Sequence, residues 1–209
     1  MNGITDHAVE LYMEDILPAR DEVLAEIEKK AHNRSIPIIG PVVARVLQQY
    51  ARIIGAKRIF EMGSAIGYST IWLARAAGEE GRVYYTDGSH SNAEEAQGYF
   101  ARAGVSDRID ILTGDSMDLL ESVEGQFDLI FNDVDKYQYP DAFKKAVPRI
   151  RKGGLFITDN VLWYGRVAKS DNDKDTEGVR EFNRLIYSDR GLLPSILPIR
   201  DGIAVCLKL

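Results

Sequence analysis

The sequence contains one cysteine, three histidines and no apolar run near the ~18 residues of a membrane span. Cys206 cannot form an internal disulfide, which indicates a reducing compartment, and we expect a cytoplasmic protein. His7 and His32 have no acidic or thiol companions at metal-ligand spacing, so we expect both on the surface. The N-terminus has acidic residues and lacks the basic segment and long apolar run of a signal peptide.

The charge balance argues against a large phosphate-binding surface. Lysine and arginine number 26 against 32 aspartate and glutamate, which gives a net charge of −6, whereas nucleic-acid binding needs a basic face. With 209 residues, the chain fits one domain that has room for a substantial core. We find no repeat, no low-complexity segment and no linker long enough to divide it.

The first quarter of the chain is predicted to be helical. Apolar residues recur every three or four positions from residue 6 to 54, which is the helical period. Pro18 interrupts the first helical piece, and residues 36–41 separate the second piece from a third at Val42–Ile54. We therefore expect a helical cap over residues 1–56 and a core over residues 57–209.

From Lys57 onward, strand and helix patterns alternate, which indicates βαβ units and a parallel sheet. The expected strands are 58–62, 83–86, 109–112, 127–132, 154–158, 192–199 and 203–207, and the expected helices follow 69 and 116 and cover 90–103 and 176–188. Asp201-Gly202 between the last two strands is typical of a hairpin turn.

Three hard oxygen donors follow two of these strands. Asp133 comes directly after strand 127–132, and Asp159 and Asn160 come directly after strand 154–158. Open α/β sheets bind ligands just past the carboxyl ends of their strands. Two carboxylates and an amide oxygen suit Mg²⁺ or another divalent cation, and no thiol or imidazole nearby favours zinc. The alternative is structural: Asp133 caps a helix, and Asp159 and Asn160 cap a turn.

The ends of the first three strands indicate a nucleoside-type cofactor. Gly63 and Gly67 allow a close backbone approach where a strand becomes a helix, although G-x-x-x-G is not the dinucleotide fingerprint G-x-G-x-x-G. Asp87 ends the second strand, where an acid can accept both ribose hydroxyls or simply cap a turn. Asp115 and Ser116 follow the third strand and add a third loop at the same edge of the sheet.

Six segments together resemble the class I S-adenosylmethionine-dependent O-methyltransferases, in particular the cation-dependent branch that includes catechol and caffeoyl-CoA O-methyltransferases. The segments are EMGSAIGYS (61–69), GDS (114–116), FNDVDKYQY (131–139), DNVLWYGRV (159–167), VREFN (179–183) and LPIRDGIAV (197–205). DVDK followed by DNVLW is far more specific than the glycine loop. The resemblance implies an α/β, Rossmann-like class I methyltransferase fold with a seven-stranded, mostly parallel sheet, helices on both faces and an antiparallel last strand. It also implies a homodimer.

The resemblance also assigns site residues. It implies Asp133, Asp159 and Asn160 as ligands of a divalent metal, and Lys136 as the catalytic lysine. It implies a site for S-adenosylmethionine formed by Ile39, Glu61, Gly63, Tyr68, Ser69, Asp87, Asp115, Ser116 and Asp133. Three positions depart from the family: Asp87 replaces a usual glutamate, Ile39 a common methionine, and Asn132 an apolar residue. None of these changes removes a metal ligand.

The chemistry that follows is methyl transfer to a catechol-like or phenolic small molecule. A phenol with a pKa near 10 is a poor nucleophile at pH 7, and binding to a metal ion stabilises its oxyanion. Lys136 can act as the base if the metal depresses its pKa, although it can also be a solvated lysine at a helix start. Trp163 and Tyr164 can form an aromatic wall for a planar acceptor, or else core or dimer contacts.

Two other functions are compatible with the fold. Some bacterial proteins that resemble this chain methylate a hydroxylated uridine in transfer RNA, but such an enzyme needs a basic surface. The loop 169–175 has three acids and two lysines, which counts against that function. A non-catalytic binding module is disfavoured because Lys136 and all three metal ligands are present.

Overall fold

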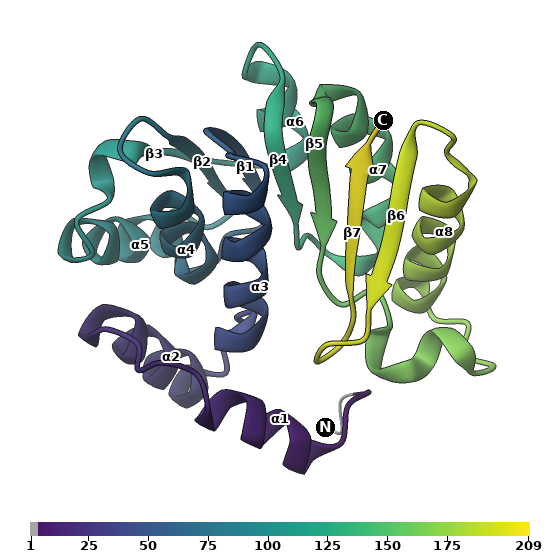
Figure 1. Ribbon diagram of the computed structural model, residues 1–209, viewed down its shortest axis with the longest axis horizontal. Helices are drawn as coiled ribbons and strands as arrows, with labels where there is room; N and C mark the ends of the chain where they lie inside the picture. Colours follow the sequence, from purple (N-terminus) through teal and green to yellow (C-terminus); the bar gives the residue numbers. More distant parts are fainter. Residues whose placement is uncertain (1–3) are drawn as a thin grey trace.

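The computed structural model describes residues 4–209, and its centre is a seven-stranded sheet in the order β3-β2-β1-β4-β5-β7-β6 (Figure 1). The strands are β1 (Arg58–Met62), β2 (Arg82–Asp87), β3 (Ile109–Thr113), β4 (Phe127–Asn132), β5 (Ile150–Thr158), β6 (Leu192–Leu197) and β7 (Ile203–Lys208). Strands β1 to β5 pair in parallel, whereas β7 is antiparallel to both β5 and β6. The Rossmann-like fold, with its antiparallel last strand, and the β6–β7 hairpin are therefore confirmed.

Helices cover both faces of this sheet. The α-helices are α1 (His7–Asp15), α2 (Glu22–Arg34), α3 (Gly40–Ile53), α4 (Tyr68–Ala77), α5 (His90–Arg102), α6 (Ser116–Ser122), α7 (Tyr139–Ala146) and α8 (Lys174–Ser188). Short 3₁₀ turns are η1 (Ser106–Arg108), η2 (Lys136–Gln138), η3 (Val147–Arg149) and η4 (Trp163–Ala168). Among residues 4–209, no helix has the length and apolar character that crossing a membrane requires.

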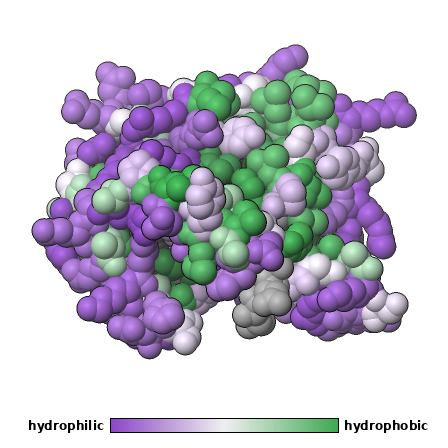
Figure 2. All heavy atoms as spheres, turned by 60° about the horizontal axis from the view of Figure 1, so that its bottom comes forward, coloured by the Kyte–Doolittle hydropathy of each residue, from purple (hydrophilic) through white to green (hydrophobic). Residues whose placement is uncertain are grey.

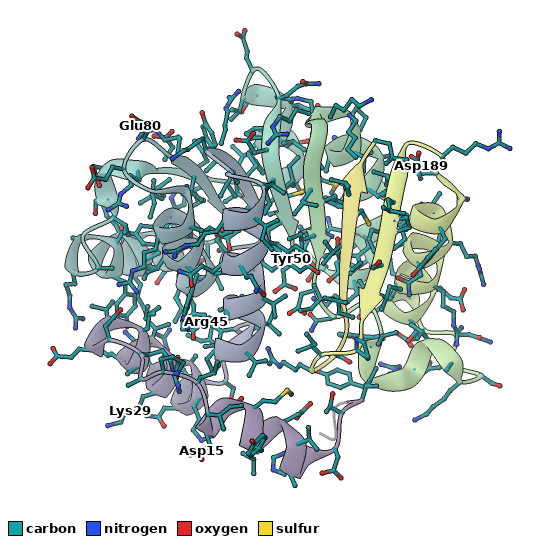
Figure 3. The ribbon with its side chains drawn as sticks, in the orientation of Figure 1. Asp15, Lys29, Arg45, Tyr50, Glu80 and Asp189 are labelled. Carbon is teal, nitrogen blue, oxygen red and sulfur yellow. The ribbon has the colours of Figure 1, made fainter. Side chains whose placement is uncertain are left out.

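The alternation of side chains along each strand builds two cores. In β1, Ile59 joins the core under α2–α5, whereas Phe60 joins the core under α6–α8. Both residues are fully buried. This double covering explains why the central strands are almost entirely apolar, since neither face of a covered parallel sheet meets water. In Figure 3, Tyr50 of α3 lies beside this buried layer, whereas Lys29 and Glu80 lie at the outside of the molecule.

Several element boundaries differ from the sequence prediction, and two of the differences have a clear cause. The third helix begins at Gly40 because Pro41 occupies its first turn, where a missing N–H costs nothing. Strand β5 begins at Ile150, four residues before the expected apolar run, because Ile150 pairs with Phe127 before the register shifts to Leu129–Leu155. The proposed division into a cap (1–56) and a core (57–209) stays a prediction.

Strand register places the functional segments in one row. Met62 pairs with Asn132, and Asn132 pairs with Thr158, so the three strands end level with one another. The ladder continues one step further, because the N–H of Asp133 donates to Met62 O (2.9 Å) and the N–H of Asp159 donates to Asn132 O (3.2 Å). In Figure 1 the arrowheads of β4 and β5 point toward the side of the molecule where α1 lies.

Candidate active site

A cavity of about 800 Å³ opens at the carboxyl ends of the parallel strands. Most of the residues that the sequence indicated lie around it: Gly63, Asp87, Asp115, Ser116, Asp133, Lys136, Asp159, Asn160, Trp163 and Tyr164. These residues come from five different segments of the chain, and the level strand ends explain why they meet. The structure therefore brings the expected metal, cofactor, catalytic and acceptor positions to one cavity.

Four expected cofactor residues do not line this cavity. Glu61, Tyr68 and Ser69 are buried behind the loop that carries Gly63, with exposed fractions of 0%, 1% and 6%. The hydroxyl of Tyr68 donates to Glu28 at 2.6 Å, which turns it toward α2. Ile39 lines a second cavity, formed beside the first by α1, α2 and the segment before α3.

The three expected metal ligands lie together, but their environments differ. Asp159 is 1% exposed, and its Oδ1 has no hydrogen-bond partner in the structure. Burial, and then the nearby charge of Asp133, raise the pKa of Asp159. The backbone of Asn160 is left-handed, with φ of 56°. Among residues 4–209 no three His, Cys, Asp or Glu side chains gather as a metal site, so a cation here depends on the Asn160 amide.

Asp133 and Lys136 form an ion pair with 2.8 Å between Oδ1 and Nζ. No backbone N–H bonds to the Asp133 side chain among residues 4–209, so the helix-cap alternative does not describe it. Burial lowers the pKa of Lys136, but Asp133 and Tyr139 outweigh it and leave that pKa raised. The sequence analysis considered a depressed pKa for Lys136, but the protein groups around Lys136 do not by themselves depress it. Lys136 is also no solvated surface lysine, because its side chain is only 14% exposed.

The glycine loop leaves no room for side chains. At Gly63 the backbone has φ of 83°, and a Cβ would lie 2.6 Å from the carbonyl oxygen of Asp133. At Gly67 the backbone has the same φ, and a Cβ would lie 2.5 Å from the Phe100 ring. The first glycine thus lets β1 and β4 continue side by side into the cavity, and the second lets α4 begin against α5.

Asp87 and Asp115 combine the two roles that the sequence left open. Asp87 accepts hydrogen bonds from the N–H of Ser89 (2.8 Å) and of Ala65 (3.0 Å), which fixes its carboxylate at the cavity. Asp115 is the N-cap of α6 and accepts from the N–H of Met117 at 2.8 Å. Each carboxylate oxygen can accept more than one hydrogen bond, so these caps leave acceptor capacity for a ligand.

The aromatic pair is held in a strained loop. Trp163 and Tyr164 both have left-handed backbones, with φ of 45° and 54°. This loop is tied to the β6–β7 turn, because Asp201 accepts from the N–H of Tyr164 through its side chain and from the N–H of Leu162 through its carbonyl. Asp201 is therefore buried, and it does more than form the hairpin turn expected from the sequence. Strain that surrounding contacts maintain is typical of functional loops.

Sequence reasoning missed several residues of the lining. Asp135, Asp175 and Arg200 all line the cavity, although none was singled out. Asp135 stands inside the DVDK segment, so its position was the available signal. For Arg200 the sequence signal was weaker, namely its position directly before the Asp-Gly turn. In the structure its backbone is left-handed, with φ of 53°. His7 and His32 are exposed, as expected.

Comparisons with known proteins point to one family. The sequence model described as O-methyltransferase matches residues 15–209. A catechol O-methyltransferase of Niastella koreensis is 32% identical over 219 residues, which cover 99% of each protein. A caffeoyl-CoA O-methyltransferase of Populus kitakamiensis is 29% identical and covers 95% of this chain and 92% of its own length.

Solved structures agree with the sequence relatives. An O-methyltransferase from Bacillus cereus, in complex with SAH, has a TM-score of 0.88 and 32% identity, and the match covers 97% of each chain. The O-methyltransferase TomG from Streptomyces achromogenes, in complex with SAM, has a TM-score of 0.88 and 29% identity over 96% of each chain. The similarity thus covers both the sheet and the N-terminal helices.

Proposed function

This chain belongs to the S-adenosylmethionine-dependent O-methyltransferase family, and on that premise we propose that it methylates a hydroxyl of a catechol-like or phenolic small molecule with the help of a divalent cation. The observation that carries the proposal is Asp159, whose buried Oδ1 lacks a partner beside a second carboxylate. A buried carboxylate without a partner is costly, and a cation removes that cost. Asp133, Asp159 and Asn160 would hold the cation, and Mg²⁺ suits these oxygen donors.

A divalent cation bound there would lower the pKa of a phenolic hydroxyl and hold two vicinal oxygens of a catechol in fixed positions. S-Adenosylmethionine bound in the same cavity would supply the methyl group from its sulfonium to the phenolic oxygen, with S-adenosylhomocysteine as the leaving group. Because the reaction depends mostly on alignment, positioning of the two reactants can supply roughly 7–11 kcal/mol of the barrier. The chain contributes that alignment through the loops at the strand ends.

We assign to Lys136 the role of handling the proton of the acceptor's hydroxyl group. Its Nζ lies 2.8 Å from Asp133 and 5.8 Å from the centre of the Trp163 ring, inside the cavity wall. With its pKa raised by Asp133, Lys136 is an ammonium that stabilises an adjacent oxyanion. It becomes a base only when the charge of Asp133 is offset. Trp163 and Tyr164 provide the flat surface on which a planar acceptor stacks.

The cofactor would lie along the first three strand ends. The Gly63 loop would face its methionine part, and Asp87 would accept the ribose hydroxyls, with Asp115 and Ser116 beyond. Roles for Ile39, Glu61, Tyr68 and Ser69 stay predictions, because they lie outside the lining of this cavity. Their contribution would be to support the loop from behind.

We also propose a homodimer in the cytoplasm. Helix α1 has no buried residue, and Val9, Leu11, Tyr12 and Ile16 are between 46% and 63% exposed. Figure 2 turns this side of the molecule toward the viewer and shows apolar side chains gathered between hydrophilic ones. Exposed apolar area of this kind is typical of an interface. Light scattering that shows a 23.4 kDa particle at micromolar concentration would contradict the dimer.

The proposed cytoplasmic location rests on the single, buried Cys206 thiol.

The deciding experiment measures transfer of labelled methyl from S-adenosylmethionine to a catechol panel, first with EDTA and then with Mg²⁺ restored. We expect EDTA to abolish transfer and Mg²⁺ to restore it. Asp159→Asn should lower transfer strongly and leave cofactor affinity, measured by calorimetry, within a few fold. The matched control is Asp141→Asn, since Asp141 is 69% exposed on α7. Full transfer in the chelator would refute the metal mechanism.

A further inference from the structure

The second cavity, about 750 Å³ in volume, lies beside the first and shares part of its lining. Five residues line both cavities: Ile36, Pro37, Ile38, Tyr164 and Arg200. The inference drawn from this shared lining concerns the class of acceptor and rests on the proposed function. Sequence relatives do not decide the class, because one is named for a free catechol and another for a coenzyme A thioester.

The two cavities concentrate the negative charge of the protein. Six aspartates and two cations line the first, and Glu10, Glu14 and Glu28 with Arg200 line the second. Counted once each, nine acids and two cations give a formal charge of −7. The whole chain carries −6, from 26 cations and 32 acids. The remaining 24 cations and 23 acids therefore give +1, so nearly all of the net charge lies at this site.

Both lining cations already contact groups of the protein itself. Lys136 is paired with Asp133 at 2.8 Å. Arg200 donates from Nη1 to the carbonyl of Ile38 at 2.8 Å, which holds the segment before α3 against the β6–β7 turn. Close to the lining, Lys174 places its ammonium over the Tyr137 ring, 3.4 Å from the ring centre. A polyphosphate would thus meet nine acids and only two cations in the lining, and both cations already contact groups of the protein.

Bound cofactors would reduce this charge without reversing its sign. A divalent cation adds +2, and S-adenosylmethionine adds a sulfonium, an ammonium and a carboxylate, which sum to +1. The lining would then carry −4 by the same count. Clefts lined by one sign of charge focus the field and change the rate at which charged ligands enter by about 10-fold to 10³-fold.

We propose that the acceptor is a free ortho-dihydroxy aromatic, neutral or cationic, and that the acidic lining excludes acceptors that carry several phosphates. The first cavity is lined both by Asp159, which the proposed function assigns to the cation, and by Trp163, and this combination suits an aromatic acceptor whose vicinal oxygens meet that cation. Coenzyme A thioesters and transfer RNA both carry phosphates, so the same lining disfavours both.

The test compares three acceptors that share one caffeoyl ring: a neutral N-alkyl amide, an aminoalkyl amide with one positive charge, and the coenzyme A thioester. At low salt we expect kcat/KM for the thioester to be at least about 10-fold below the value for the neutral amide. Raising the salt to about 0.5 M should increase kcat/KM for the thioester and decrease it for the cation, because salt screens exposed charges. Calorimetry with SAH-loaded protein should rank the binding affinities of the three acceptors in the same order as their kcat/KM values.

Asp135 and Asp175 allow a clean test of the charge. Neither carboxylate makes a side-chain hydrogen bond or ion pair within residues 4–209, so removing its charge breaks no contact in that range. Asp135→Asn/Asp175→Asn should raise kcat/KM for the thioester relative to the neutral amide by about 10-fold, and should flatten both salt profiles. Asp107→Asn is the control, because Asp107 is 77% exposed at the opposite end of β3. Circular dichroism checks that each variant folds.

The outcomes separate this inference from the proposed function. Transfer to the amides with little transfer to the thioester supports both. Preferred transfer to the thioester or to transfer RNA, with salt lowering it, overturns the inference and leaves metal-dependent methyl transfer intact. No transfer to any caffeoyl acceptor overturns the proposed function itself. An unchanged selectivity ratio in the double variant would show that these two aspartates do not set the acceptor class.

Discussion

The buried carboxyl group of Glu61 should make the stability of this protein depend on pH. Glu61 ends the apolar part of β1 and is 0% exposed. Burial raises its pKa from 4.5 to about 7, although the hydroxyls of Ser69, Thr70 and Ser64 oppose the rise. One carboxyl oxygen accepts from Thr70 Oγ1, and the other has no partner. The folded protein thus holds a proton on Glu61 that the unfolded chain has already released.

The sign and size of this pH dependence follow from the linkage between proton binding and folding. Because the pKa of Glu61 is higher in the folded chain, its contribution to stability is fully present below about pH 4.5 and is lost as the pH rises through about 7. Each pKa unit is worth about 1.4 kcal/mol, so the rise from 4.5 to about 7 corresponds to roughly 3 kcal/mol. Between about pH 5 and pH 8, where most of this change falls, the free energy of unfolding should lose roughly 2–3 kcal/mol.

Glu61→Gln removes this titration and keeps the shape of the side chain. Urea unfolding at about pH 5 and about pH 8 gives the free energy of unfolding for both proteins. The wild type should lose roughly 2–3 kcal/mol more than the variant between the two pH values. Any constant cost of the amide cancels in this comparison, as does the titration of other buried groups such as Asp159. Glu80→Gln, on the surface, should follow the wild type (Figure 3). Parallel pH profiles for wild type and Glu61→Gln would refute the reasoning.

Three further predictions concern the cavity. Asp87→Ala should weaken S-adenosylmethionine binding by roughly 1–3 kcal/mol, the range for losing a charged hydrogen bond, and unchanged affinity by calorimetry would remove Asp87 from the site. Gly63→Ala should abolish cofactor binding, because its Cβ would lie 2.6 Å from the Asp133 carbonyl oxygen; normal binding would show that the loop can move aside. Lys136→Ala should lower kcat by about 10²–10⁴-fold while cofactor affinity stays within a few fold, whereas the exposed control Lys144→Ala should keep full kcat.

Much of the fold could be predicted because its causes are local. The strands β1 and β4 begin and end at the residues that the apolar runs indicated, since a strand covered on both faces must be apolar along its length. The start of β5 was missed because Arg151-Lys152-Gly153 carries no apolar signal, and only pairing with β4 makes it a strand. Pairing with another strand is not a local property.

The sequence by itself determined the family resemblance, the alternation of strands and helices, and the identity of most residues at the strand ends. It could not determine that Met62, Asn132 and Thr158 lie level, which is what brings Asp133 and Asp159 together. Nor could it determine that Lys136 is paired and buried, or that Asp135, Asp175 and Arg200 complete the lining. Burial and neighbouring charge arise from packing between segments far apart in the chain. Only the tertiary structure therefore decided which acids share one cavity, and with them the charge that an acceptor meets.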